Sequence, residues 1–272
     1  MRLSEALTIC IAAFERNDAL ARCVASIREI TKTIPVIVVN DGRLPPVLHL
    51  TNGRLINMKF DSGLSAKRNM MLKVVRSKYM MLLDDDFFFR RQFPFGEMVD
   101  VLERHDDIDI LGGRIEGRTT NWNTTVLRIN GTEIDRRSGA HRKGGGITYC
   151  DMIPNFWVGD VAKIRKMGGW DADLKCGGEH LDFFAKAKKA GIGVAQMDTP
   201  FIGHRHTNSK FYDKQLSRRV GYIDMMMRKG GYTRVKHNGR VIYEIDSDNV
   251  FHRREGSAAA QRRRSRKQAL QA

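Results

Sequence analysis

Short apolar runs alternate with amphipathic stretches through the first half of the chain. An uninterrupted apolar run of a few residues is typical of a strand that is buried on both faces. Such runs lie at residues 7–12, 34–39, 55–60 and 80–83. Between the first two runs, Leu20, Val24 and Ile27 recur at the spacing of one helical face. A strand, a helix and a second strand in succession form a βαβ unit, so we predict an α/β fold with a mostly parallel sheet flanked by helices.

The second half of the chain has a mixed pattern. The expected helices are 97–104, 161–167, a stretch that ends near 190, and 213–228. The expected strands are 108–111, which Gly112 and Gly113 interrupt, and 194–197. Asn130-Gly131 is a hairpin signal within the short β segments of 117–147, and a second hairpin is expected over 232–245. From Phe251 onward the apolar periodicity ends, which predicts disorder.

Acidic residues follow two of the predicted strands. Asp41 lies just after the second strand, and Asp84, Asp85 and Asp86 follow the fourth. In open α/β sheets, ligands bind beyond the carboxyl ends of the strands. Three adjacent carboxylates repel one another unless a cation lies between them, and hard oxygen ligands suit a Mg²⁺ or Mn²⁺ ion that also holds a phosphate. The alternatives are a solvated acidic turn for the three acids and an Asx turn before Gly42 for Asp41.

Charged residues near other element ends add further candidates. Lys67–Arg68 lies in the first turn of a predicted helix, where the helix dipole disfavours cations unless an anion neutralises them. Glu179 and Asp182 are three residues apart at the start of another predicted helix, so they share one face. His204 and His206 form a His-x-His pair just past the last core strand, which makes them candidate metal ligands.

The composition favours a globular protein with polyanionic ligands. The formal net charge is +16, of which residues 252–272 carry +6, so the remaining body carries +10. A basic body and tail favour nucleotide phosphates, nucleic acid or an anionic membrane surface, with a solubilising surface as the alternative. No apolar run reaches about 18 residues, and the start of the chain lacks the pattern of a signal peptide. With four widely spaced cysteines, we expect a cytoplasmic protein with reduced thiols, in a bacterial, viral or host cytoplasm.

Six segments resemble, in the same order, motifs of GT-A fold glycosyltransferases, and within them the family-two-like enzymes that include the β-1,4-N-acetylgalactosaminyltransferases. The segments are TICIAAFER, VVNDG, SGLSAKRN, MLLDDDFFF, GGWDADLKCGGEHLDFF and GHRH, between residues 7 and 206. The resemblance implies a Rossmann-like, mostly parallel sheet with a smaller mixed region on the acceptor side. We expect four parts: a nucleotide-sugar-binding half (1–116), an acceptor-binding and catalytic half (117–206), a C-terminal helix and hairpin (207–250) and a disordered basic tail (251–272).

The resemblance also implies roles for individual residues. The residues placed at the nucleotide-sugar are Ala13, Glu15, Arg16, Asp41, Lys67, Arg68, Asn69, Asp84 and Asp85. Asp86, the last acid of the DXD motif, would coordinate Mn²⁺ or Mg²⁺ together with Asp84 and with His204 or His206. Glu179 would lie near the acceptor hydroxyl. Because His180 stands where the family more often has a second acid, the resemblance leaves either Glu179 or Asp182 as the base.

The residues and the resemblance together predict a metal-dependent inverting glycosyltransferase. It would move a sugar from a UDP-hexose or UDP-N-acetylhexosamine donor to a hydroxyl acceptor, expected to be a glycan. Such a transfer needs a carboxylate that takes the proton of the acceptor and a cation that holds the charge on the departing diphosphate. An alternative acceptor is a hydroxymethylated base in DNA, which would use the basic surface. A nucleic-acid-binding protein without catalysis lacks a supporting zinc or RNA-binding motif, and a nucleotidyltransferase would not need an acid after the glycine pair.

Overall fold

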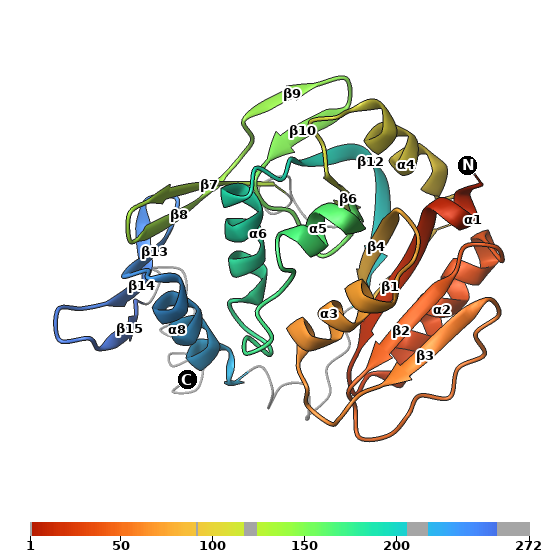
Figure 1. The fold of residues 1–272 in the computed structure, drawn as a ribbon, viewed down its shortest axis with the longest axis horizontal. Helices are drawn as coiled ribbons and strands as arrows, with labels where there is room; N and C mark the ends of the chain where they lie inside the picture. The colour runs from red at the N-terminus through yellow and green to blue at the C-terminus, as the bar shows by residue number, and fades with distance from the viewer. Residues whose placement is uncertain (1, 91, 117–123, 206–216, 255–272) are drawn as a thin grey trace, which may run out of the picture.

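The computed structural model describes residues 2–90, 92–116, 124–205 and 217–254, which form two β-sheets with helices packed against them (Figure 1). The first strands of the chain, in red and orange, build one side of the larger sheet. The C-terminal strands, in blue, form part of the smaller sheet at the opposite end of the molecule.

The larger sheet has ten strands and is the centre of the fold. Its strands in spatial order are β3 (Gly53–Asn57), β2 (Val36–Asn40), β1 (Leu7–Ala13), β4 (Tyr79–Asp84), β11 (Trp157–Asp160), β6 (Ile110–Ile115), β12 (Val194–His204), β10 (Ile147–Cys150) and β9 (Arg142–Gly144), with β5 (Phe87–Phe88) paired to β12. Strands β3, β2, β1 and β4 run parallel to one another, as do β6 and β12, whereas β11 lies antiparallel between β4 and β6. The α/β fold with a mostly parallel sheet that the sequence predicts is therefore confirmed.

The central strands of this sheet are continuous apolar runs in the sequence because both faces of the sheet are covered by apolar side chains. Along β1, Ile9 and Ile11 pack into one hydrophobic cluster, while Cys10 and Ala12 pack into another. The first cluster includes side chains of two helices, α2 (Asn17–Ile30) and α4 (Phe95–Arg104). The second includes side chains of α3 (Leu64–Val74), α5 (Val161–Lys166), α6 (Glu179–Lys189) and α8 (Arg219–Gly230). Since side chains alternate between the faces of a strand, every residue of β1 is buried.

The smaller sheet joins two regions that are far apart in the sequence. Its order is β15 (Phe251–Arg253), β14 (Arg240–Ile245), β13 (Arg234–His237), β8 (Glu133–Ser138) and β7 (Thr125–Asn130). Both predicted hairpins are present, β7–β8 and β13–β14, and β13 pairs with β8 to connect them. The helix α1 (Leu3–Ala6) is a short turn before β1.

Three expectations from the sequence differ from the structure. The prediction of disorder from Phe251 is wrong for β15, because the ring of Phe251 stacks on Tyr243 while the backbone pairs with β14; residues 255–272 lie outside the described ranges. Strand β6 is not interrupted by its two glycines, because it pairs with β11 on one side and β12 on the other. The glycine at 113 makes room for a neighbour, since an added Cβ there would collide with the ring of Phe156. Strand β12 continues past 197 to His204, with an irregularity after Gln196.

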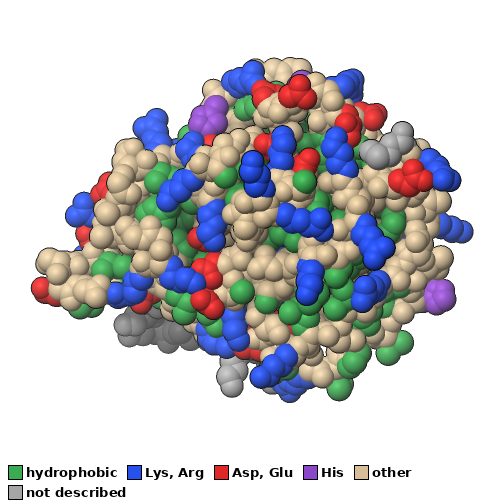
Figure 2. Space-filling view, viewed as in Figure 1, with side chains coloured by type: hydrophobic (Ala, Val, Ile, Leu, Met, Phe, Trp, Pro, Cys, Tyr) green, Lys and Arg blue, Asp and Glu red, His purple; other side chains and the backbone are tan. Residues whose placement is uncertain are grey.

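The basic residues are spread over the surface. Figure 2 shows Lys and Arg side chains scattered across the whole of one face, with Asp and Glu side chains among them. Among the residues that the structure describes, no helix is both long and apolar enough to cross a membrane.

Candidate active site

A pocket of about 400 Å³ lies where the carboxyl ends of β1, β2 and β4 meet the start of α6. Its charged lining consists of the acids Asp41, Asp61, Asp84, Asp85, Asp86 and Glu179 and the bases Arg16, Lys67, Lys175, His204 and Arg219. The strand-end acids therefore do reach a common cavity, as the sequence predicts for the carboxyl edge of a parallel sheet.

Arg16, which follows β1, forms ion pairs with two of the three strand-end acids. Its guanidinium donates to Asp86 Oδ2 at 2.6 Å and to Asp85 Oδ1, and the amide of Phe14 donates to Asp85 Oδ2 at 3.2 Å. Burial raises the pKa of Asp85 to about 6, although Arg16 acts in the opposite direction. Asp84 receives a weaker contact from Asn155, whose Nδ2 lies 3.4 Å from Asp84 Oδ2. The sequence placed Arg16 at the nucleotide-sugar, and in the structure it lines the pocket as a partner of the acids.

Asp86 and His204 are the described side chains that best suit a divalent cation. His204 Nε2 lies 3.3 Å from Asp86 Oδ2 because β12 pairs with β5, directly after the acids. Burial raises the pKa of Asp86, but the contacts with His204 and Arg16 outweigh this and leave the pKa below its ordinary value. In the described part of the chain, no group of three or more His, Cys, Asp or Glu side chains could hold a metal alone. The donor chemistry nevertheless fits Mn²⁺ or Mg²⁺, which take one or two carboxylates and complete their shell with phosphate and water oxygens.

His206, the second histidine of the His-x-His pair, lies outside the described residues. The open alternative between His204 and His206 as metal ligands therefore stays a prediction. What the structure adds is that His204 lines the pocket.

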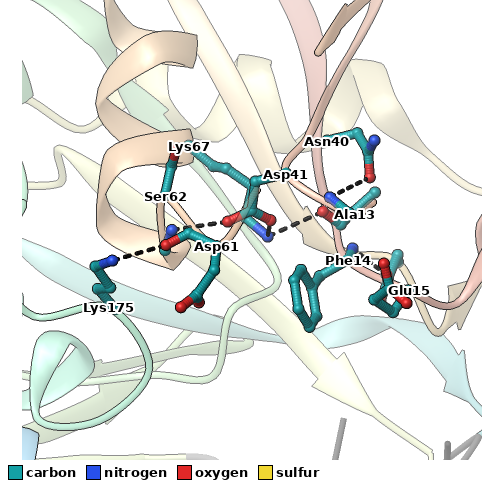
Figure 3. Close-up of polar contacts among 12 residues, drawn as sticks. Ala13, Phe14, Glu15, Asn40, Asp41, Asp61, Ser62, Lys67 and Lys175 are labelled. Carbon is teal, nitrogen blue, oxygen red and sulfur yellow. Dashed lines mark hydrogen bonds and ion pairs between the residues drawn. The ribbon is translucent and has the colours of Figure 1, made fainter. Parts of the chain in front are cut away.

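Asp41 and Lys67 form a buried ion pair at the floor of the pocket (Figure 3). Lys67 Nζ donates to Asp41 Oδ1 at 2.5 Å and to the carbonyl of Ala13 at 2.9 Å, and the amide of Gly63 donates to Asp41 Oδ2 at 2.7 Å. Lys67 in the first turn of α3 is thus neutralised by a carboxylate of the chain itself. Both side chains still line the pocket, and their contact with a nucleotide stays a prediction.

Arg68 and Asn69 lie behind the pocket wall rather than in it. The side chain of Arg68 is 0% exposed, with Nη2 3.5 Å from Asp84 Oδ1 and Nη1 4.0 Å from Glu179 Oε1. Asn69 exchanges two hydrogen bonds with the backbone of Trp170, at 2.7 and 2.9 Å. The structure therefore gives these two residues supporting positions, where the sequence placed them against the nucleotide.

Ala13 and Glu15 also differ from the expected position. The pocket is lined by their neighbours Ala12 and Phe14, while Ala13 is buried and the Glu15 carboxylate accepts a hydrogen bond from the amide of Arg43 at 2.6 Å. Because side chains alternate along a strand, neighbouring residues point in opposite directions. Ala12 and Phe14 therefore line the pocket, whereas Ala13 and Glu15 do not.

Glu179 lies at the pocket, whereas Asp182 does not line it. Glu179 is the first residue of α6 and is 8% exposed, and burial raises its pKa although Arg68 opposes the rise. Asp182 forms an ion pair with Lys186 at 2.7 Å along the same helix. His180 packs edge-on against Phe184, and burial lowers its pKa to about 3, so it is uncharged near neutral pH. Of the two acids that the sequence left open, the structure brings Glu179 to the acidic cluster.

Sequence reasoning did not name ten of the described lining residues, among them Phe14, Asp61, Asn155, Lys175 and Arg219. Phe14 could have been found from the sequence, since it directly follows the first predicted strand and ligands bind beyond the carboxyl ends of such strands. Asn155 and Lys175 lie in irregular segments without periodicity. Arg219 belongs to α8, beyond the segments that carry the family resemblance, and its place at the pocket follows only from the packing of that helix.

The fold and the pocket together define an α/β protein of the GT-A class, with acids at the strand ends facing an acid at a helix start. The sequence agrees with this class: residues 8–167, more than half of the chain, match the model of glycosyl transferase family 2. The chain belongs to glycosyl transferase family 2, and the family resemblance inferred from its motifs is confirmed.

Similar curated proteins include two N-acetylgalactosaminyltransferases. The chain is 28% identical over 194 residues to β-1,4 N-acetylgalactosaminyltransferase 1 of Rattus norvegicus, covering 67% of this chain and 36% of that protein. It is 28% identical over 171 residues to β-1,4 N-acetylgalactosaminyltransferase 2 of Mus musculus, covering 61% of this chain and 33% of that protein. The chain thus spans about a third of the length of these curated relatives.

Solved structures support the fold. GalNAc-T7 with UDP, GalNAc and Mn²⁺ superposes with a TM-score of 0.61 at 12% identity, over 82% of this chain and 47% of that one. TarS 1–349 of S. aureus gives a TM-score of 0.55 at 12% identity, over 81% of this chain and 65% of that one. At this identity the likeness concerns the fold alone, and it confirms the GT-A architecture predicted above.

Proposed function

We propose that the protein transfers a hexose or N-acetylhexosamine from a UDP-sugar to a hydroxyl group of a glycan, with inversion at the anomeric carbon. The observation that carries this proposal is the single pocket shared by the strand-end acids Asp84–Asp86 and by Glu179 at the start of α6. Donor binding and proton removal are separate tasks, and the two acidic sites come from different parts of the chain. Membership of the family and similarity to N-acetylgalactosaminyltransferases support this class of donor.

The donor side of the pocket offers an aromatic side chain and two basic ones. Phe14 lines the pocket and stacks on Phe60, with ring centroids 6.0 Å apart, which suits contact with a nucleoside base. Lys175 Nζ donates to the carbonyl of Asp61 at 2.8 Å, and Arg219 Nε donates to the carbonyl of Cys176 at 3.1 Å. Among the described residues these contacts use main-chain oxygens and no carboxylate. Both cations are therefore suited to offset the charge of a diphosphate.

Asp86, His204 and Asp84 would hold a divalent cation, with Mn²⁺ or Mg²⁺ fitting the donor set. When bound, such an ion supplies electrostatic stabilisation for the charge on the departing diphosphate. Arg16, which contacts both Asp85 and Asp86, keeps the neighbouring carboxylates charge-balanced.

Glu179 is proposed as the general base. Its carboxylate would take the proton from the acceptor hydroxyl while the oxygen attacks the anomeric carbon from the side opposite the leaving UDP. Attack from the opposite side gives inversion. General-base help of this kind contributes roughly 10²–10⁴-fold to the rate.

The test is a donor screen with the full chain. Release of nucleoside diphosphate from UDP-, GDP- and TDP-sugars is measured with and without Mn²⁺, first alone and then with an array of glycan acceptors. We expect turnover with UDP-hexose or UDP-N-acetylhexosamine, stimulated by acceptor and by Mn²⁺. Turnover confined to GDP- or TDP-sugars would correct the donor, and turnover of no nucleotide-sugar in any combination would overturn the proposed function.

A further inference from the structure

Arg68 is a fully buried cation that lies between two carboxylates from distant parts of the chain. It projects from α3, and its guanidinium lies 3.5 Å from Asp84 at the end of β4 and 4.0 Å from Glu179 at the start of α6. Its guanidinium carbon also lies 5.6 Å from the ring centre of Trp170. These contacts connect the strand-end acids with the acid at the helix start through one side chain.

The burial of Arg68 is poorly compensated. Among the described residues, neither Nε nor Nη1 of Arg68 has a hydrogen-bond partner. Removing a charged group from water is costly, and a pair with imperfect geometry recovers only part of that cost. A well-packed apolar residue at such a site is often neutral or more stable. Stability therefore gives a weak reason for an arginine at this position.

We propose that Arg68 is a positioning residue that holds Glu179 in place relative to Asp84, and so fixes the base against the donor-binding acids. This inference rests on the proposed function, in which Glu179 is the base. Arg68 does not touch substrate in this role, because its side chain is 0% exposed and does not line the pocket. A guanidinium is planar, keeps its charge and presents several donors at once, so it can face two carboxylates, whereas a lysine ammonium acts as a point charge.

The first test is Arg68→Lys, which keeps the charge but loses the two-sided geometry. We expect kcat for sugar transfer to fall about tenfold or more, since a misplaced catalytic group is costly. The Kd for UDP, measured by calorimetry, should stay within about twofold, because the donor pocket keeps its own lining residues. The matched control is Arg76→Lys, at an exposed arginine just after the same helix, which should leave both values unchanged.

The second test uses a double variant, because the effect of Arg68 on Glu179 must be separated from its effect on Asp84. Arg68→Lys combined with Glu179→Gln keeps a positive charge beside Asp84 but leaves no base to position, and its residual transfer rate is compared with that of Glu179→Gln alone. If Arg68 acts through Glu179, the two rates are equal within about twofold.

The possible results separate this inference from the proposed function. A double variant far slower than Glu179→Gln, or an Arg68→Lys variant with normal kcat, would overturn the positioning role while leaving the glycosyltransferase proposal intact. A loss of UDP affinity as large as the loss of kcat in Arg68→Lys would instead assign Arg68 to donor binding. A wild-type protein without any transfer activity would overturn both.

Discussion

Glu179 combines burial with a charged neighbour, and the two affect its pKa in opposite directions. Burial raises the pKa, Arg68 lowers it, and the pKa stays above that of an ordinary glutamate. A base must be ionised, so kcat should rise with pH through this raised pKa and fall off in mild acid sooner than an ordinary glutamate would require. The measurement is kcat at saturating substrates over a pH series. A rate that stays constant down to the ordinary glutamate range would contradict the assignment.

Separate substitutions of the two acids of α6, Glu179 and Asp182, test which one is the base. Glu179→Gln preserves the shape of the side chain but removes the proton acceptor, so transfer should fall about 10²-fold or more with UDP affinity retained. Asp182→Asn is the matched control, since Asp182 forms an ion pair with Lys186 along the same helix and does not line the pocket. If the control shows the large loss and Glu179→Gln does not, the base is Asp182.

Asp86 and His204 are the proposed ligands of the divalent cation, and their substitution should change how the rate depends on Mn²⁺. Asp86→Ala should abolish transfer in the presence of Mn²⁺, because it removes the carboxylate that His204 approaches at 3.3 Å. His204→Ala should keep activity but require a higher Mn²⁺ concentration, since one ligand is lost. The Mn²⁺ dependence of the rate measures both. Full activity of the wild type in excess chelator would exclude the metal role.

At the scale of elements, the start of α6 depends on close packing against α8. Gly178, the residue before the helix, has a φ of +77°, and a Cβ there would lie 2.8 Å from Cβ of Met226 in α8. Gly178→Ala should therefore lower the melting temperature, with a cost of about 1–2 kcal/mol from the left-handed backbone alone. It should also reduce kcat, because Glu179 is the next residue.

The control for this change lies at the other end of the same helix. Gly191 has a φ of +72°, and no atom lies within 4 Å of a Cβ added there. Gly191→Ala should thus show the backbone cost without the collision and without the loss of kcat. Equal effects of the two variants on melting temperature and on kcat would mean that packing against α8 does not position Glu179.

The elements that could be predicted from sequence are those whose signal is local. Strand β1 and helix α2 carry continuous apolar or helical patterns, and the pattern alone places them. The glycines of β6 were interpreted as a break, but Gly113 is required by the ring of Phe156, which is distant in sequence. The strand at 251–253 was missed because three residues are too few for a periodicity, and its partner β14 is what makes it a strand.

At the scale of the whole molecule, some residues of the site could be predicted from the sequence and others could not. Asp41 and Asp84–Asp86 could be predicted because the carboxyl ends of parallel strands meet at one edge of the sheet. The direction of Arg68 could not, since only the packed structure shows that α3 places it beneath the pocket. Arg219 could not be predicted either, because the packing of α8 against the glycine pair at 177–178 brings it to the site.

The balance of charge in the pocket leads to a last prediction. Its lining, counted over the residues that the structure describes, has six carboxylates against four Lys and Arg side chains, and Arg16 and Lys67 are engaged with Asp85, Asp86 and Asp41. A diphosphate adds further negative charge, and among the described lining residues Lys175 and Arg219 are the basic side chains whose hydrogen bonds go to main-chain oxygens. We therefore expect them to contact the diphosphate. Arg219→Ala should weaken UDP binding about tenfold, in the range of a charge-assisted hydrogen bond.

Binding of uridine, which lacks phosphates, should change much less in this variant. Calorimetric titrations with UDP and uridine in parallel measure the difference. Lys73→Ala, at an exposed lysine of α3, removes the same net charge away from the pocket and should leave both affinities unchanged. If Lys73→Ala weakens UDP binding as much as Arg219→Ala does, the long-range field of the basic protein attracts the nucleotide. A loss confined to Arg219→Ala and to UDP would place the diphosphate beside α8, because only a short-range contact distinguishes two variants of equal net charge.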